Sequence, residues 1–218
     1  MGQGIQYGSA PCRCEHSFHA TRLIALTGGP GGGKTAALEL AVRSFCEHVA
    51  ILPEAASVVF GGGFPRHETD PGRAAAQRAI YHVQREMERL VVEERRVAVA
   101  LCDRGTVDGL AYWPGDTSEL LRELGTSHEG ELTRYDAVLH LRTPAATQGY
   151  DHSNTLRVES AVEAIALDRR IDELWTAHDN REVVEASDDF LTKMRRALEV
   201  VRSRLPSCCH VHPLAVSS

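Results

Sequence analysis

The chemically most distinctive residues of this 218-residue chain are eight consecutive positions with the sequence GGPGGGKT. They match the pattern GxxxxGK[ST], the P-loop, without a gap. In such a loop, backbone N–H groups wrap around a phosphate, the lysine reaches the β- and γ-phosphate oxygens, and the final hydroxyl binds Mg²⁺. We expect a nucleoside triphosphate to be bound by Gly28, Gly29, Pro30, Gly31, Gly32, Gly33, Lys34 and Thr35.

The flanking residues fit the strand, turn and helix that a P-loop requires. Residues 23–26 form a short apolar run, as in a buried strand, and residues 36–45 favour a helix. The start of that helix carries a partial positive charge that attracts phosphate. The alternative is a chance match in a Gly-rich turn, which at ordinary glycine usage of about 7% arises in roughly one chain in a hundred of this length.

Polar residues follow two further apolar runs of the sequence. Asp103 and Arg104 come directly after residues 97–102, and Glu54 follows residues 49–52. Ligands of parallel sheets bind at the carboxyl ends of the strands, so we expect Asp103 to hold Mg²⁺, directly or through water. Glu54 would accept the proton of an attacking hydroxyl. The structural alternatives are a turn aspartate that caps a helix and a helix-start acid facing the helix dipole.

One later helix is expected to turn charged residues inward. Over residues 157–178 the helical period places six residues on one face: Arg157, Ala161, Ala164, Asp168, Ile171 and Trp175. Phosphate oxygens are one partner for Arg157, and an ion pair that only fixes the helix is the other interpretation. We expect Arg157 or Arg169 to act in a lid. Asp108 either supports the site or lies on the surface.

Short apolar runs alternate with helical patterns along the chain, which is typical of an α/β protein with a mostly parallel sheet covered on both faces. The expected strands are residues 22–27, 49–52, 97–102, 137–141 and 181–185. The expected helices are residues 33–47, 71–95, 105–113, 117–134 in two pieces, 157–178 and 188–204. We expect one domain at 21–205, with a lid at about 143–170 and flexible tails at 1–20 and 206–218.

Composition narrows the classes of partner. The formal net charge of −6 gives no basic surplus for a nucleic-acid backbone, so nucleic acid is not expected. No stretch approaches the roughly 18 apolar residues of a membrane span, and residues 1–20 lack the apolar core of a secretion signal. We therefore expect a cytoplasmic protein.

The six cysteines are few and scattered. Cys46 and Cys102 lie at the ends of apolar elements, where a reduced, buried thiol is expected. Two Cys/His sets in the predicted tails are able to ligate a metal, although neither has a standard zinc spacing. The first set is Cys12, Cys14, His16 and His19, and the second is Cys208, Cys209, His210 and His212.

Five segments together resemble the small P-loop group labelled as an AAA-type ATPase domain: GGPGGGKT, LPEAAS, LCDRGTVDGLAYWPG, YDAVLHLRTP and NTLRVESAVEAIALDRRIDELW. That group is similar to nicotinamide riboside kinase domains and, more distantly, to thymidylate and deoxynucleoside kinases. The resemblance covers about residues 20–205. It implies a P-loop NTPase three-layer sandwich with five parallel strands in the order 2-3-1-4-5 and a helical lid. Its motifs assign Asp103-Arg104 as the kinase DR pair, Glu54 as the acid of the second strand, and Arg157 and Arg169 as lid arginines.

The sequence also departs from its relatives. It lacks the separate helical domain and the sensor or arginine-finger segment of ring-forming ATPases, so no ring motor is expected. The segment FGGGFPR, residues 60–66, has no counterpart in the nucleoside kinases, so the acceptor does not carry over.

These residues lead us to predict an ATP-binding, Mg²⁺-dependent, kinase-like phosphotransferase that acts on a small molecule of nucleoside or nicotinamide riboside type. The alternative is a nucleotide-dependent switch or slow NTPase whose lid or 60–70 loop is recognised by a partner. The sequence does not choose between ATP and GTP, because no base-reading motif such as the guanine-specific NKxD occurs.

Overall fold

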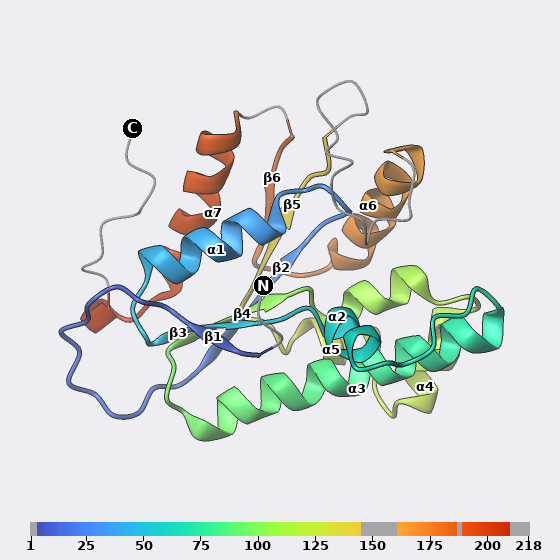
Figure 1. The fold of residues 1–218 in the computed structure, drawn as a ribbon, viewed down its shortest axis with the longest axis horizontal. Coiled ribbons are helices and arrows are strands. Elements are labelled where there is room, and N and C mark those ends of the chain that lie inside the picture. The colour runs from blue at the N-terminus through green and yellow to red at the C-terminus, as the bar shows by residue number, and fades with distance from the viewer. Residues whose placement is uncertain (1–3, 145–160, 187–188, 210–218) are drawn as a thin grey trace.

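The computed structural model describes residues 4–144, 161–186 and 189–209 (Figure 1). The elements in chain order are β1 (Gln6–Tyr7), β2 (Arg22–Thr27), α1 (Lys34–Ser44), β3 (Val49–Leu52), α2 (Ala55–Gly61), α3 (Asp70–Glu94), β4 (Val99–Asp103), η1 (Thr106–Tyr112), α4 (Thr117–Glu123), α5 (His128–Leu132), β5 (Ala137–Leu141), α6 (Ala161–Trp175), β6 (Arg181–Val184), α7 (Phe190–Arg204) and η2 (Ser207–Cys209). The two η elements are 3₁₀ helices.

One sheet runs through the centre of the molecule in the order β1-β3-β4-β2-β5-β6. The five strands from β3 to β6 pair in parallel, which confirms the fold class and the order expected from the sequence. β1 is an addition that the sequence did not reveal. It pairs antiparallel with β3 at the edge, with Gln6 opposite Ile51.

Helices cover both faces of the sheet, as the unbroken apolar strands require. Helices α1 and α7 pack on one face, while α3, η1 and α6 pack on the other (Figure 1). The strands are buried on both sides; for example, Ile24 and Ala25 of β2 point to opposite faces and are each fully buried. The carboxyl ends of the parallel strands therefore meet at one edge, where the loops are free to carry chemistry.

The helical patterns were predicted with two differences. Residues 55–61 form α2, which the sequence analysis did not identify, and residues 157–160 of the expected 157–178 helix lie outside the described residues. The inward face of α6 is confirmed, since Ala164, Asp168, Ile171 and Trp175 are all buried. Among the described residues, no helix combines the length and the apolar character needed to cross a membrane.

A buried polar network, here called the α3 network, links α3 to the α5 region. Glu88 and Glu131 are 0% and 1% exposed, and Arg134 forms ion pairs with both carboxylates. The Tyr135 hydroxyl donates to Glu88 Oε1 over 2.6 Å, and the Thr106 hydroxyl donates to Glu131 Oε2 over 2.7 Å. Buried charges are tolerated here because each one is paired and hydrogen-bonded.

Candidate functional site

The glycine-rich motif forms the turn between β2 and α1. Gly28 has φ 123°, and a Cβ there would lie 2.2 Å from the carbonyl oxygen of Leu141. Gly33 occupies the N-cap of α1 with φ 94°, a conformation that residues with a side chain rarely adopt. No side chain caps this helix. The first N–H groups of α1 therefore face the loop without an acceptor from the helix, as an anion-binding turn requires.

Lys34 lies inside this turn. Its Nζ donates to the carbonyl oxygens of Gly28 and Gly29 over 2.7 and 2.9 Å, and the side chain is buried. Burial, followed by the nearby charge of Arg104, lowers the pKa of Lys34 to about 8, although three carboxylates act in the opposite direction. The ammonium group is thus still mostly protonated at neutral pH. Its partners among the described residues are neutral carbonyls, which a phosphate oxygen would replace with a charged partner.

Arg104 connects the strand ends. Its Nε donates to Glu54 Oε1 over 2.7 Å, and one terminal nitrogen lies 3.3 Å from both the Gly28 carbonyl and Asp108 Oδ2. The backbone of Arg104 has φ 75°, which is uncommon for a residue with a side chain and typical of strained functional positions. Burial opposes ionisation of Glu54, but the Arg104 charge and the hydrogen bond from Ser57 outweigh it and lower the pKa of Glu54.

Asp103 is the exception among these charges. Within the described part of the chain, its carboxylate makes neither a hydrogen bond nor an ion pair. Burial and repulsion from Glu54 raise the pKa of Asp103 to about 6. The site as a whole holds two cations, Lys34 and Arg104, and three carboxylates, those of Glu54, Asp103 and Asp108. This formal excess of negative charge, with one carboxylate unpaired, fits a divalent cation.

Thr35 supplies the other expected oxygen for that cation. It is the second residue of α1, and it is exposed. Its hydroxyl and the carboxylate of Asp103 are the hard oxygen donors that Mg²⁺ prefers, so the residues present fit this ion.

Asp108 is buried and its carboxylate contacts several of the surrounding side chains. It accepts hydrogen bonds from the Thr27 hydroxyl over 2.7 Å and from Trp175 Nε1 over 2.6 Å, in addition to the contact with Arg104. Of the two alternatives for Asp108, the surface position is wrong, because the side chain is buried. The acid positions Arg104, which in turn positions Glu54.

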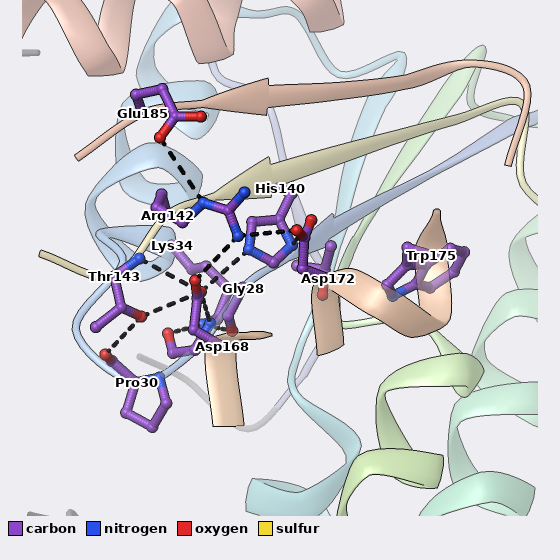
Figure 2. A network of polar contacts seen from close by, with 12 residues as sticks. Gly28, Pro30, Lys34, His140, Arg142, Thr143, Asp168, Asp172, Trp175 and Glu185 are labelled. Atoms are coloured by element: carbon purple, nitrogen blue, oxygen red, sulfur yellow. Dashed lines mark hydrogen bonds and ion pairs between the residues drawn. The ribbon is translucent and has the colours of Figure 1, made fainter. Parts of the chain in front are cut away.

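Asp168 of α6 tethers the P-loop to the sheet (Figure 2). Its Oδ1 accepts the Gly29 N–H over 2.7 Å, lies 3.1 Å from His140 Nε2, and also accepts the Thr143 hydroxyl over 3.2 Å. The same hydroxyl contacts the carbonyl of Pro30. Burial opposes ionisation of Asp168, but the hydrogen bonds from His140 and Gly29 and the charge of Arg142 lower its pKa to about 2.

Arg142 extends this network to the edge of the sheet. One of its terminal nitrogens lies 3.0 Å from Asp172 Oδ2 and 3.4 Å from Asp168 Oδ2, and its Nε lies 3.8 Å from Glu185 (Figure 2). Arg181 also pairs with Asp172. The start of the loop after β5 is thus fixed to α6 and β6.

The structure brings together most, though not all, of the predicted site residues. The P-loop residues, Glu54, Asp103 and Arg104 converge at the carboxyl ends of β2, β3 and β4. Arg157 lies outside the described residues, and Arg169 is exposed on α6. Sequence reasoning placed Asp168 on the inward face but missed its bond to the P-loop amide. The signal was present, because a buried carboxylate needs hydrogen-bond donors.

A parallel sheet in the order 3-4-2-5-6, a glycine-rich turn after the central strand and a lysine within that turn define a P-loop nucleotide-binding protein with a kinase-like fold. The family model described as "AAA domain" matches residues 23–193. The chain belongs to this family.

One solved structure with a TM-score above 0.5 agrees on the fold. The NadR protein in complex with NAD and AMP-PNP aligns with a TM-score of 0.52 at 17% identity, over 85% of this chain and 49% of the NadR chain. This chain thus spans about half the length of NadR. Shikimate kinase from Acinetobacter baumannii aligns with a TM-score of 0.49 at 18% identity, over 85% of this chain and 93% of the kinase. Deoxyadenosine kinase from M. mycoides with bound dCTP aligns with a TM-score of 0.48 at 16% identity, over 83% of this chain and 99% of the kinase. Among curated proteins, none matches this sequence.

Proposed function

We propose that the chain is a Mg²⁺-dependent phosphotransferase that moves the γ-phosphoryl group of ATP to a hydroxyl of a small molecule. The observation that carries this proposal is the position of Glu54. Its ionised carboxylate stands at the tip of β3, paired with Arg104 at 2.7 Å and close enough to Lys34 and Asp103 to influence the pKa of both. A base beside the phosphate-binding residues is what a kinase needs and a simple nucleotide-binding protein does not.

The proposed roles follow from the contacts. Lys34 leaves the carbonyls of Gly28 and Gly29 to neutralise the transferred phosphate, and Asp103 and Thr35 hold Mg²⁺, which when bound supplies positive charge to the phosphate oxygens. Glu54 accepts the proton of the acceptor hydroxyl. Arg104, held by Asp108, keeps Glu54 ionised and oriented.

The lid arginines remain part of the proposal. Arg169 follows Asp168 directly on α6, so its Cα is anchored beside the P-loop while its side chain is exposed. From there it would close over the phosphates together with Arg157 and exclude water. The acceptor class, a nucleoside or a nicotinamide riboside type molecule, rests on the likeness to NadR, whose structure contains NAD and AMP-PNP.

The test is the variant Glu54→Gln, which keeps the shape of the side chain but removes the base. We expect phosphoryl transfer to fall by about 10²–10⁴-fold, measured as ADP formation with a panel of nucleosides and nicotinamide riboside. The affinity for ATP should change little. Glu54→Asp should recover part of the activity, because it restores a carboxylate. Glu93→Gln, an exposed change on α3, is the matched control and should behave like the parent.

The alternative is a switch or slow NTPase, using ATP or GTP. One observation favours it: both oxygens of Glu54 are engaged, since Oε2 also accepts the Ser57 hydroxyl over 2.8 Å. In that case Glu54 would only fix α2 and Arg104. A parent protein that binds or slowly hydrolyses nucleotide, transfers phosphate to none of the acceptors and is indifferent to Glu54→Gln would establish this second function.

A further inference from the structure

Cysteine and histidine side chains from three distant parts of the chain gather at the amino end of β3, opposite the P-loop. Cys12 comes from the N-terminal segment, Cys46 and His48 from the turn between α1 and β3, and Cys209 from η2. The donor atoms of these four residues all lie within 4.8 Å of one another. In Figure 1, the short red η2 lies beside the dark-blue N-terminal segment and the start of β3.

Three sulfur atoms surround one imidazole nitrogen in this group. His48 Nδ1 lies 3.4 Å from Cys12 Sγ, 3.7 Å from Cys46 Sγ and 3.4 Å from Cys209 Sγ, and the sulfurs of Cys12 and Cys209 are 3.9 Å apart. Hydrogen bonding alone does not account for this, because a neutral imidazole nitrogen accepts a single proton. Four ligands arranged tetrahedrally around Zn²⁺ would have sulfurs about 3.8 Å apart and sulfur–nitrogen distances of about 3.6 Å.

We propose that Cys12, Cys46, His48 and Cys209 bind one Zn²⁺ ion as a closed structural site, here called the amino-edge site. The donor set is Cys₃His, one of the standard sets of structural zinc, and no ligand position is left for a substrate. On binding, the three thiols lose their protons to solvent and the neutral imidazole coordinates through Nδ1. The ion would join both ends of the described chain to the sheet.

The surroundings support a built site. Cys46 and Cys209 are fully buried and His48 is 8% exposed, so water has little access to these three ligands, while Cys12 is partly exposed. The N–H of Cys14 points to Cys12 Sγ at 3.4 Å, the kind of backbone contact that stabilises a metal-bound thiolate. The carbonyl of His48 accepts the Ala98 N–H over 2.7 Å, which fixes the residue against β4.

A second group of donors borders the first. Cys14, His16, His19 and Cys208 lie next to it, and Cys14 with His19 forms an alternative set that also uses His48 and Cys209. Because two residues are shared, both sets cannot be filled by separate four-coordinate ions. We assign the ion to the first set, because three sulfurs surround His48 Nδ1 there and Cys46 is 0% exposed against 8% for His19. His210 and His212, which the sequence also offered, lie outside the described residues.

Metal analysis of the full chain tests the proposal. The protein is purified without a polyhistidine tag and without added metal, and its metal content is measured by mass spectrometry after gel filtration. We expect about one zinc ion per chain. Cys46→Ala and Cys209→Ala should lose it, whereas Cys102→Ala, which removes an equally buried thiol on β4, should retain it. Cys14→Ala should also retain it, which separates the two overlapping sets.

A Co²⁺ titration of the reduced, metal-free parent keeps the test valid where a cysteine variant fails to fold. A tetrahedral site with three thiolates gives strong sulfur-to-cobalt charge-transfer absorption, and zinc should displace the cobalt. The proposal is overturned if the parent carries no zinc and shows no such absorption, or if its mass reveals disulfides among these cysteines. Zinc that persists in Cys46→Ala, or zinc that is lost from Cys14→Ala, would also overturn it, because Cys209 belongs to both sets and does not separate them.

Discussion

Two regions of this molecule bury carboxylates, and they differ in how those carboxylates are partnered. In the α3 network, Glu88 and Glu131 are paired with Arg134 and accept hydroxyl hydrogen bonds as well. At the carboxyl ends of the strands, Asp103 has no such partner among the described residues, and Lys34 bonds only to carbonyls. The first region is complete without a ligand, and the second is not.

This difference separates stability from function. Removing one member of a fully paired buried network is strongly destabilising, because it leaves a charged partner buried without compensation. An unpaired carboxylate and a buried ammonium instead lower stability, and such groups persist where binding uses them. Substitutions in the α3 network should therefore lower the free energy of unfolding, whereas substitutions at the carboxyl ends of the strands should impair ligand binding or catalysis without such a loss of stability.

The largest expected effect is on the stability of the α3 network. Arg134→Met removes the cation shared by Glu88 and Glu131, and we expect the free energy of unfolding to fall by about 3–5 kcal/mol in urea denaturation. The affinity for ATP of the protein that remains folded should be unchanged. Arg89→Met, which removes an exposed ion pair on α3, should leave the urea midpoint nearly unchanged. Equal losses of unfolding free energy in both variants would mean that the buried network stabilises the protein no more than an exposed ion pair does.

The next effect is on function at the opposite edge. Lys34→Ala should lower phosphoryl transfer or hydrolysis by about 10²–10³-fold, because Lys34 is the proposed ammonium ligand of the phosphates. The thermal stabilisation by Mg²⁺-ATP, worth about 2.7 kcal/mol at a hundredfold excess over the dissociation constant, should disappear. Without nucleotide, the variant should be no less stable than the parent. A parent that ignores every nucleoside triphosphate would contradict the assignment of this edge.

Only one side of this contrast, the carboxyl ends of the strands, could be predicted from the sequence. The P-loop, Glu54 and Asp103 are local signals, since each follows a short apolar run and the parallel order brings the run ends together. The observed bounds of β2, β3 and β5 agree with the prediction, because the apolar runs end sharply at polar or glycine residues.

Contacts between distant segments could not be predicted in this way. The Asp168 tether joins positions 139 residues apart, and the amino-edge site needs Cys46 and His48, which the spacing of the tail cysteines does not indicate. The α3 network was also missed. Its further members include Tyr81 and Gln84, which donate to Glu131 and Glu88.

A smaller effect is expected for Asp168, which tethers the P-loop to α6 and β5. Asp168→Asn keeps the shape but loses the charge, so we expect a loss of about 2 kcal/mol at pH 7. The pKa of Asp168 is lowered to about 2 in the folded protein, so its contribution is present above about pH 4 and is lost as the pH falls toward 2. The difference between parent and variant should shrink to about 1 kcal/mol near pH 3. A difference that stays constant with pH would show that the charge is not responsible.

The smallest effect should have the opposite sign. Asp103→Asn replaces an unpaired, partly buried carboxylate with a neutral amide, so the protein without nucleotide should gain about 1 kcal/mol in urea denaturation at pH 7. The same variant should lose most of the extra stabilisation that Mg²⁺ adds to ATP, because Asp103 is the proposed ligand. Asp136→Asn is the control in the paired class: Asp136 accepts the Leu23 N–H over 3.1 Å, so this change should not stabilise the protein. If Asp103→Asn destabilised the protein as much as Asp136→Asn does, Asp103 would belong with the paired carboxylates. The distinction between the two regions would then fail.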